Sequence, residues 1–181
     1  MLNKQEAEAA LNQIEQTQRR SIELIGYWRS GIYVQIWGVV WIVAYMGSYF
    51  LPEVSNIIWL ICNGFGVTAT AILSLRDRNN AQQEKRLAWA MVVVASFGLL
   101  VSYNLLAHRP GTLPVFWTCL IMSAYILAGL WAGTRWIVLG AAVIAISVAT
   151  YFYFMPWFDL IMAFAGGGGL LLVGTWMARA K

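Results

Sequence analysis

The residues that could perform catalysis or bind a metal are few and isolated in this sequence. Both cysteines, Cys62 and Cys119, lie inside apolar segments, and neither has a histidine or a second cysteine near it. Metal sites need such neighbours at short spacings, so we interpret both cysteines as small apolar residues. We expect no catalytic residue, metal site or cofactor, and we do not expect an enzyme.

The six apolar runs described below contain no Asp, Glu, Lys, Arg or His. Glu53, His108, Arg109 and Asp159 lie just outside these runs, all at the ends predicted to be external. Proton relays and ion pumps usually place ionisable groups within the membrane. An intramembrane hydrolase would also need a base or a metal ligand there. Both classes are therefore disfavoured, although backbone carbonyls can coordinate cations without any charged side chain.

An aromatic ladder occupies the first apolar run, where Tyr33, Trp37, Trp41, Tyr45 and Tyr49 recur every four residues. Four residues turn a helix by about 400°, so the rings drift by roughly 40° at each step and form a spiral ridge. The favoured interpretation is packing against neighbouring helices or lipid. The alternative is a stacking surface for an apolar or cationic ligand. Trp37 and Trp41 are the candidate residues, because they lie too deep for an interfacial belt.

The last apolar run contains four consecutive glycines, Gly166, Gly167, Gly168 and Gly169, with Gly174 following. Glycine lets membrane helices approach closely, but it also weakens a helix, by about 1 kcal/mol relative to alanine in water. The run is either a packing surface on several sides, which we favour, or a hinge. A broken helix at this point would indicate a transport site.

Two carboxamides inside the apolar runs, Asn63 and Asn104, are costly to leave unpaired in hydrocarbon. The favoured interpretation is hydrogen bonding between helices, worth about 0.6 kcal/mol each on average. The alternative is a neutral lining for a small solute.

The elements that must position these residues are transmembrane helices. Of the 181 residues, 60% are hydrophobic and 11% are charged, whereas soluble domains carry about 25% charged residues. A bilayer core needs roughly 20 apolar residues per helix, and only helices satisfy their own backbone groups in lipid. We predict an all-α, polytopic bundle of six transmembrane helices in the lipid bilayer, at Ile32–Phe50, Ile57–Leu75, Leu87–Leu106, Val115–Ala132, Trp136–Phe154 and Leu160–Ala178.

Basic residues predict the orientation of this bundle. With the N-terminus inside, the cytoplasmic segments hold eleven of the twelve Lys and Arg residues, and the external loops hold Arg109 alone. Both termini are therefore expected in the cytoplasm, in a multi-pass membrane protein. The same rule accounts for the net charge of +4, and no basic cluster indicates nucleic-acid binding.

Residues 1–30 form a separate polar segment before the transmembrane domain of residues 31–181. Leu11, Ile14, Ile22 and Ile25 fall on roughly one face at helical spacing. We predict a cytoplasmic amphipathic helix that could bind a cytoplasmic protein partner.

Three short motifs mark a resemblance that covers the N-terminal third of the chain. They are Gln18-Arg19-Arg20-Ser21, Gly26-Tyr27, and Trp37-Gly38-Val39-Val40-Trp41 with Tyr45. This part resembles small bacterial inner-membrane proteins of uncharacterised function. The resemblance implies a bacterial source and carries no activity or site residue.

Two functions therefore stay open. The first is a non-catalytic interaction or regulatory protein, or a subunit of a membrane complex. The second is a small transporter or channel for a neutral or apolar solute, acting as a homo-oligomer. The lack of ionisable groups in the apolar runs and the short loops favour the first.

Overall fold

The computed structural model describes residue 13 and residues 31–76, 81–106 and 110–179, and these are almost entirely helical, with no strand among them. The predicted all-α class is confirmed. The predicted N-terminal helix of residues 1–30 lies outside the described residues except for Gln13, which is helical.

The first described helix spans Gly31–Phe50. The elements after it, in chain order, are the 3-10 turn η1 (Pro52–Val54), α2 (Ser55–Arg76), α3 (Ala81–Asn104), the 3-10 turn η3 (Pro110–Thr112), α4 (Leu113–Ala132), α5 (Thr134–Tyr153), the 3-10 turn η4 (Met155–Trp157), α6 (Phe158–Ile161), the π-helical segment η5 (Met162–Gly168) and α7 (Gly169–Ala178).

Five helices are long and apolar enough to cross a membrane: Gly31–Phe50, Pro52–Leu75, Leu113–Ala132, Thr134–Tyr153 and Met155–Ala178. The third predicted span differs from the others. Its apolar part, Trp89–Asn104, is shorter than these five. Helix α3 begins earlier than predicted, at Ala81, because the polar residues before Leu87 continue the helix without adding apolar length.

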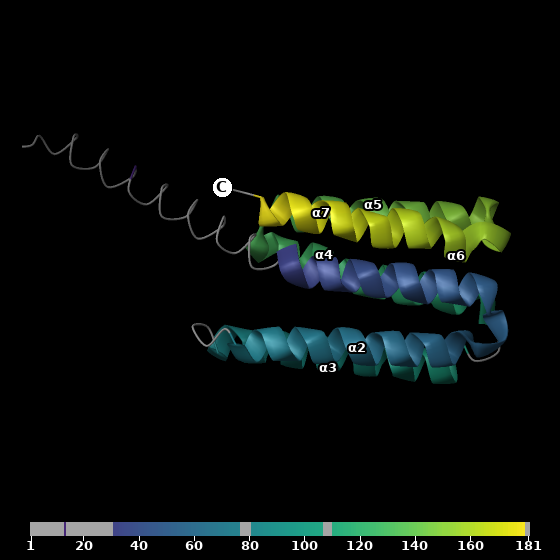
Figure 1. The fold of residues 1–181 in the computed structure, drawn as a ribbon, viewed down its shortest axis with the longest axis horizontal. Coiled ribbons are helices and arrows are strands. Elements are labelled where there is room, and N and C mark those ends of the chain that lie inside the picture. Colours follow the sequence, from purple (N-terminus) through teal and green to yellow (C-terminus); the bar gives the residue numbers. More distant parts are fainter. Residues whose placement is uncertain (1–12, 14–30, 77–80, 107–109, 180–181) are drawn as a thin grey trace, which may run out of the picture.

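The long helices lie side by side along one common direction (Figure 1). In this view the Gly31–Phe50 helix lies between a layer that holds α5, α6 and α7 and a second layer in which α2 overlaps α3. Helix α4 packs extensively on α5. Close contacts also join the Gly31–Phe50 helix to α2 and α7, and α3 to α4.

The connection between α4 and α5 is a single residue, Gly133. Its φ of 112° lies in the left-handed region, which disfavours side chains and suits glycine at the end of a helix. The connection between α5 and α6 contains Pro156, within η4, and α5 ends before it at Tyr153. Proline cannot continue an α-helix, because it has no backbone N–H and its ring clashes with the preceding turn.

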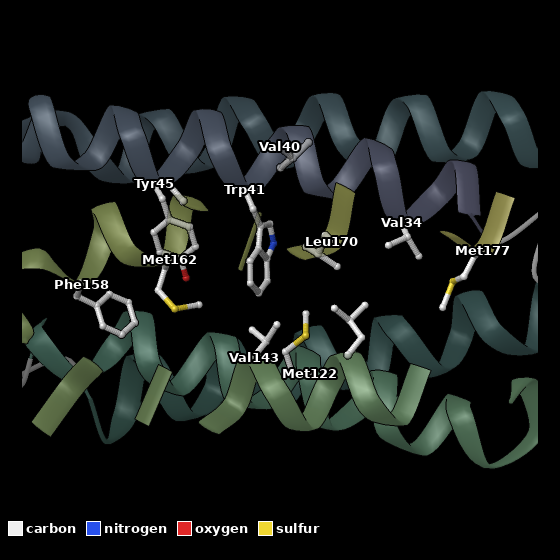
Figure 2. Packing of buried hydrophobic residues seen from close by; sticks show 12 residues of the cluster. Val34, Val40, Trp41, Tyr45, Met122, Val143, Phe158, Met162, Leu170 and Met177 are labelled. Atoms are coloured by element: carbon white, nitrogen blue, oxygen red, sulfur yellow. The ribbon is translucent and has the colours of Figure 1, made fainter. Parts of the chain in front are cut away.

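The core lies between the Gly31–Phe50 helix, α4, α5 and the α6–η5–α7 segment. Val34, Met122, Met162, Leu170 and Met177 are all 0% exposed. Figure 2 shows Trp41 extending from the first helix toward Val143 and Met122, and Tyr45 extending toward Met162 and Phe158. Methionine suits such a place because its flexible chain fills irregular gaps.

Charged residues of η1, α2, α5 and α6, together with Arg179, are sorted by sign to opposite ends of the bundle. Arg76 ends α2, Arg135 lies in the first turn of α5, and Arg179 follows α7, all at the end where the first helix begins. Glu53 and Asp159 lie at the other end, in η1 and α6. Only apolar and neutral polar residues lie between these two sets in the helices concerned.

Candidate functional site

A glycine seam joins the first and last helices of the described chain. We define it as Gly31 and Gly38 on the first helix and Gly167 and Gly174 on the η5–α7 segment. A Cβ atom at Gly31 would lie 2.7 Å from the Gly174 carbonyl oxygen, and one at Gly38 would lie 3.0 Å from that of Gly167. Within each helix the two glycines are seven residues, or about two turns, apart. The seam therefore brings two antiparallel backbones together at two successive levels.

The predicted glycine run divides into two pairs. A Cβ at Gly166 would lie 3.1 Å from the Trp41 ring, and one at Gly167 would lie 2.9 Å from the Ile42 backbone nitrogen. No atom of another described helix lies within 4 Å of the Cβ positions of Gly168 and Gly169. The first pair is a packing surface and the second pair faces open space.

The glycine run is helical rather than unwound. The segment Met162–Gly168 is a π-helix, and Gly169 continues into α7 with φ −60° and ψ −43°. A π-helix is wider than an α-helix and is found mostly as short bulges, frequently at functional sites. The broken helix that would indicate a transport site is not present in this described segment.

Tyr45 lies at the centre of a buried aromatic and hydroxyl cluster. Its hydroxyl is 2.8 Å from the Thr118 Oγ1 on α4, and both residues are buried. Edge-to-face ring contacts link Tyr45 to Trp41 at 5.7 Å, Trp59 at 4.9 Å and Phe158 at 6.2 Å between ring centroids. Four helical segments therefore meet at one tyrosine.

A second buried hydroxyl, that of Ser147 on α5, has no hydrogen-bond partner among the described residues. Ser147 is 0% exposed. Gly140 contacts Ile126, and Gly129 contacts Ile137, so the antiparallel register of α4 and α5 places Ser147 about level with Thr118. The bundle thus holds an unpaired hydroxyl at the level of the Tyr45 cluster.

The remaining predicted site residues do not converge on this cluster. Trp37 is half-buried and its ring lies against Gly66 of α2. Asn63 is exposed on α2, and Asn104 is exposed near the end of α3, where its Nδ2 donates a 2.8 Å hydrogen bond to the Leu100 carbonyl oxygen. The two carboxamides do not line a common surface with the glycine run.

Gly31 and Gly38 were not predicted from the sequence as partners of the glycine run. The available signal was the seven-residue spacing, which Gly31 and Gly38 share with Gly167 and Gly174. Spacing alone does not pair two helices, because other glycines, such as Gly133 and Gly140, also lie seven residues apart.

At the end of the bundle where the first helix begins, Arg135 ties α5 to α7. Its Nη1 donates a 3.1 Å hydrogen bond to the Trp176 carbonyl oxygen, and its guanidinium carbon lies 4.2 Å from the centroid of the Trp176 ring. This cation–π contact and the hydrogen bond act on the same residue.

The described residues include no group of three or more His, Cys, Asp or Glu side chains that could hold a metal ion. The arrangement offers packing and neutral hydrogen bonding rather than acid–base chemistry. No protein-family model matches the sequence, and no curated protein or solved structure is significantly similar to it.

Proposed function

We propose that the protein is a non-catalytic, multi-pass membrane protein that acts as an interaction or regulatory subunit of a membrane assembly. It crosses the membrane six times, with α3 as the third span, and both termini are cytoplasmic. The sorting of Arg76, Arg135 and Arg179 to one end of the bundle supports this orientation. The resemblance of its N-terminal third favours a bacterial inner membrane.

The glycine seam is the observation that carries the interaction function. It holds the backbones of the first and last spans in close contact. One of its members, Gly167, lies in the glycine run, which is the segment where a transport hinge would have to open. The seam also fixes Gly31, the residue directly after the polar segment of residues 1–30. The bundle then serves as a rigid anchor for that segment, which is the part of the chain proposed to bind a cytoplasmic partner.

Transport of a neutral solute is the second candidate, and two observations favour it. The segment Met162–Gly168 is a π-helix, with open space at the Cβ positions of Gly168 and Gly169, and the buried Ser147 hydroxyl has no hydrogen-bond partner in the described part of the chain. A widened helix and an unpaired neutral hydroxyl in one bundle are features that passage of a small neutral solute would use. The packed interior around Met122, Met162 and Leu170 favours the first function over this one.

Two measurements on purified protein and cells separate these functions. Proteoliposomes that contain the full chain are shrunk osmotically with glycerol or urea, and the rate at which the solute then enters is measured. We expect the same rate of solute entry as in empty liposomes. A photo-crosslinker at position 22 in cells should give a discrete protein adduct, whereas one at Val148, on the apolar surface, should not. Faster solute entry together with loss of the adduct would establish transport instead.

The membrane topology is tested separately by cysteine labelling from outside intact cells, in a background without Cys62 and Cys119. A cysteine at position 109 should react with a membrane-impermeant maleimide, and a cysteine at position 80 should react only after lysis. Equal labelling of both positions from outside would overturn the topology.

A further inference from the structure

Helix α2 is the least covered of the long apolar helices. Only 6% of its apolar window is buried, compared with 17% to 44% for the other four. Its close contacts run to the first helix, through Gly66 against Trp37 and Val40 and through Ile58 against Gly47. The remaining faces of α2 are exposed, including Leu60 at 74% and Val67 at 59%.

This exposed surface carries a polar group in the middle of the helix. Asn63 lies near the midpoint of Ser55–Arg76 and is exposed. In the portion of the chain that the structure describes, no hydrogen bond is made by its side chain. A primary amide that faces hydrocarbon without a hydrogen-bond partner is strongly unfavourable, because its donors and acceptor have lost the water that satisfied them. Lipid tails cannot relieve this cost.

Asn104 provides the internal comparison. It is also an exposed asparagine on an apolar helix, but its Nδ2 donates to the Leu100 carbonyl oxygen of its own helix. Asn63 has no such bond, and its neighbour Gly64 has no atom within 4 Å of its Cβ position. The space beside Asn63 is therefore open to another backbone.

We propose that the α2 surface formed by Leu60, Asn63, Gly64 and Val67 is the contact between two copies of this chain. A carboxamide is both a donor and an acceptor, so two Asn63 side chains related by a two-fold axis along the membrane normal satisfy each other. Gly64 allows the two helices to approach closely enough for this bond. The inference rests on the proposed function, since only a bilayer makes the unpaired amide costly.

The experiment measures the oligomeric state of the full chain in nanodiscs of phosphatidylethanolamine and phosphatidylglycerol and by native mass spectrometry from mild detergent. We expect a dimer for the wild type. Asn63→Leu should raise the dimer dissociation constant about tenfold or more, because interhelical polar bonds of about 1–2 kcal/mol are lost. Asn63→Gln should keep most of the dimer, and Asn104→Leu, the matched control, should not change it.

Cysteine crosslinking tests the geometry independently of these polar substitutions. In a Cys62→Ala, Cys119→Ala background, Leu60→Cys should form an oxidative dimer in native membranes. Val148→Cys is the control on α5, at the same end of the bundle and also exposed, at 37%; it should stay monomeric.

A wild type that is monomeric in the membrane would overturn the proposal, as would an Asn63→Leu protein with unchanged dimerisation. A crosslink from Leu60→Cys to a different protein, with no dimer, would overturn it too. In these cases the protein still resists carbonate extraction, so the proposed membrane function stands. Release of the protein by carbonate would overturn both.

Discussion

Gly38 faces Gly167 across the first and last helices, so that a Cβ at Gly38 would lie 3.0 Å from the Gly167 carbonyl oxygen. The relationship is nearly reciprocal, since a Cβ at Gly167 would lie 3.0 Å from the Gly38 carbonyl oxygen. Neither position leaves room for a side chain unless the helices separate. Small residues at such crossings are the usual basis of helix packing in lipid.

The glycine run should therefore respond unequally to alanine. Gly167→Ala places a methyl group 2.9 Å from the Ile42 backbone nitrogen. We expect the free energy of unfolding to fall by about 1–3 kcal/mol, as for other overpacked sites. Gly168→Ala meets no atom within 4 Å, so alanine's better helix propensity should leave stability unchanged or higher by up to about 1 kcal/mol. Thermal unfolding in detergent, followed by tryptophan fluorescence, measures both.

These two variants control each other, because they make the same chemical change at adjacent positions. Equal thermal midpoints for Gly167→Ala and Gly168→Ala would show that the first and last helices are not in close contact at this level.

The bond between Tyr45 and Thr118 should be measurable as a coupling energy. Tyr45→Phe keeps the ring contacts with Trp59 and Phe158 but removes the hydroxyl, and Thr118→Val removes its partner. Each single change leaves a buried hydroxyl unpaired, at a cost of about 1 kcal/mol. The double variant should lose less stability than the sum of the two single losses. The difference, the coupling energy, should be about 0.6–1.7 kcal/mol, the range for such bonds in membranes. Strict additivity in the double-mutant cycle would contradict the bond.

Ser147→Ala should not destabilise the protein, although the residue is completely buried. The hydroxyl has no hydrogen-bond partner among the described residues, so the substitution removes a desolvated polar group and about one atom of packing. We expect equal stability or a gain of up to about 1 kcal/mol. The measurement is denaturant-induced unfolding in mixed micelles. A clear loss of stability would mean that Ser147 holds a bound water or solute, and Ser147→Cys, which is similar in size, then serves as the volume control.

Arg135→Gln should weaken the attachment of α5 to α7 by about 0.5–1 kcal/mol, because it removes a cation–π contact at a partly exposed site. Arg135→Lys keeps the positive charge but not the planar donor group that reaches the Trp176 carbonyl oxygen. The lysine variant should therefore lie between wild type and glutamine in thermal midpoint. If Arg135→Lys and Arg135→Gln were equally stable, the charge over the Trp176 ring would have no role.

Sequence reasoning predicted the helices well, because hydrophobic length is a local property. The predicted run Val115–Ala132 corresponds to α4 at Leu113–Ala132, and Trp136–Phe154 corresponds to α5 at Thr134–Tyr153. Boundaries differ mainly where a polar stretch continues a helix, as at the start of α3. A predicted apolar run ends at the first charged residue, whereas the backbone hydrogen bonds of the helix continue past that residue.

The pairing of helices could not be predicted in the same way. The aromatic ladder shows the reason: Trp37 lies against Gly66 of α2, Trp41 against Gly166, and the Tyr45 hydroxyl bonds Thr118 of α4. Three rings on one helix thus meet three different neighbours. The spiral can be seen in the sequence, but the identity of each neighbour depends on how the helices are arranged in space.

The contact between Gly31 and Gly174 also has a consequence for biosynthesis. The first helix emerges from the ribosome early, but its partner on α7 is encoded more than a hundred residues later. At the usual synthesis rates of 5–20 residues per second, this delay is on the order of ten seconds. During that interval α7 is not present to cover Gly31 and Gly38, and a prematurely terminated chain would never acquire it. Truncated products of this protein should therefore be the species that quality-control proteases degrade first.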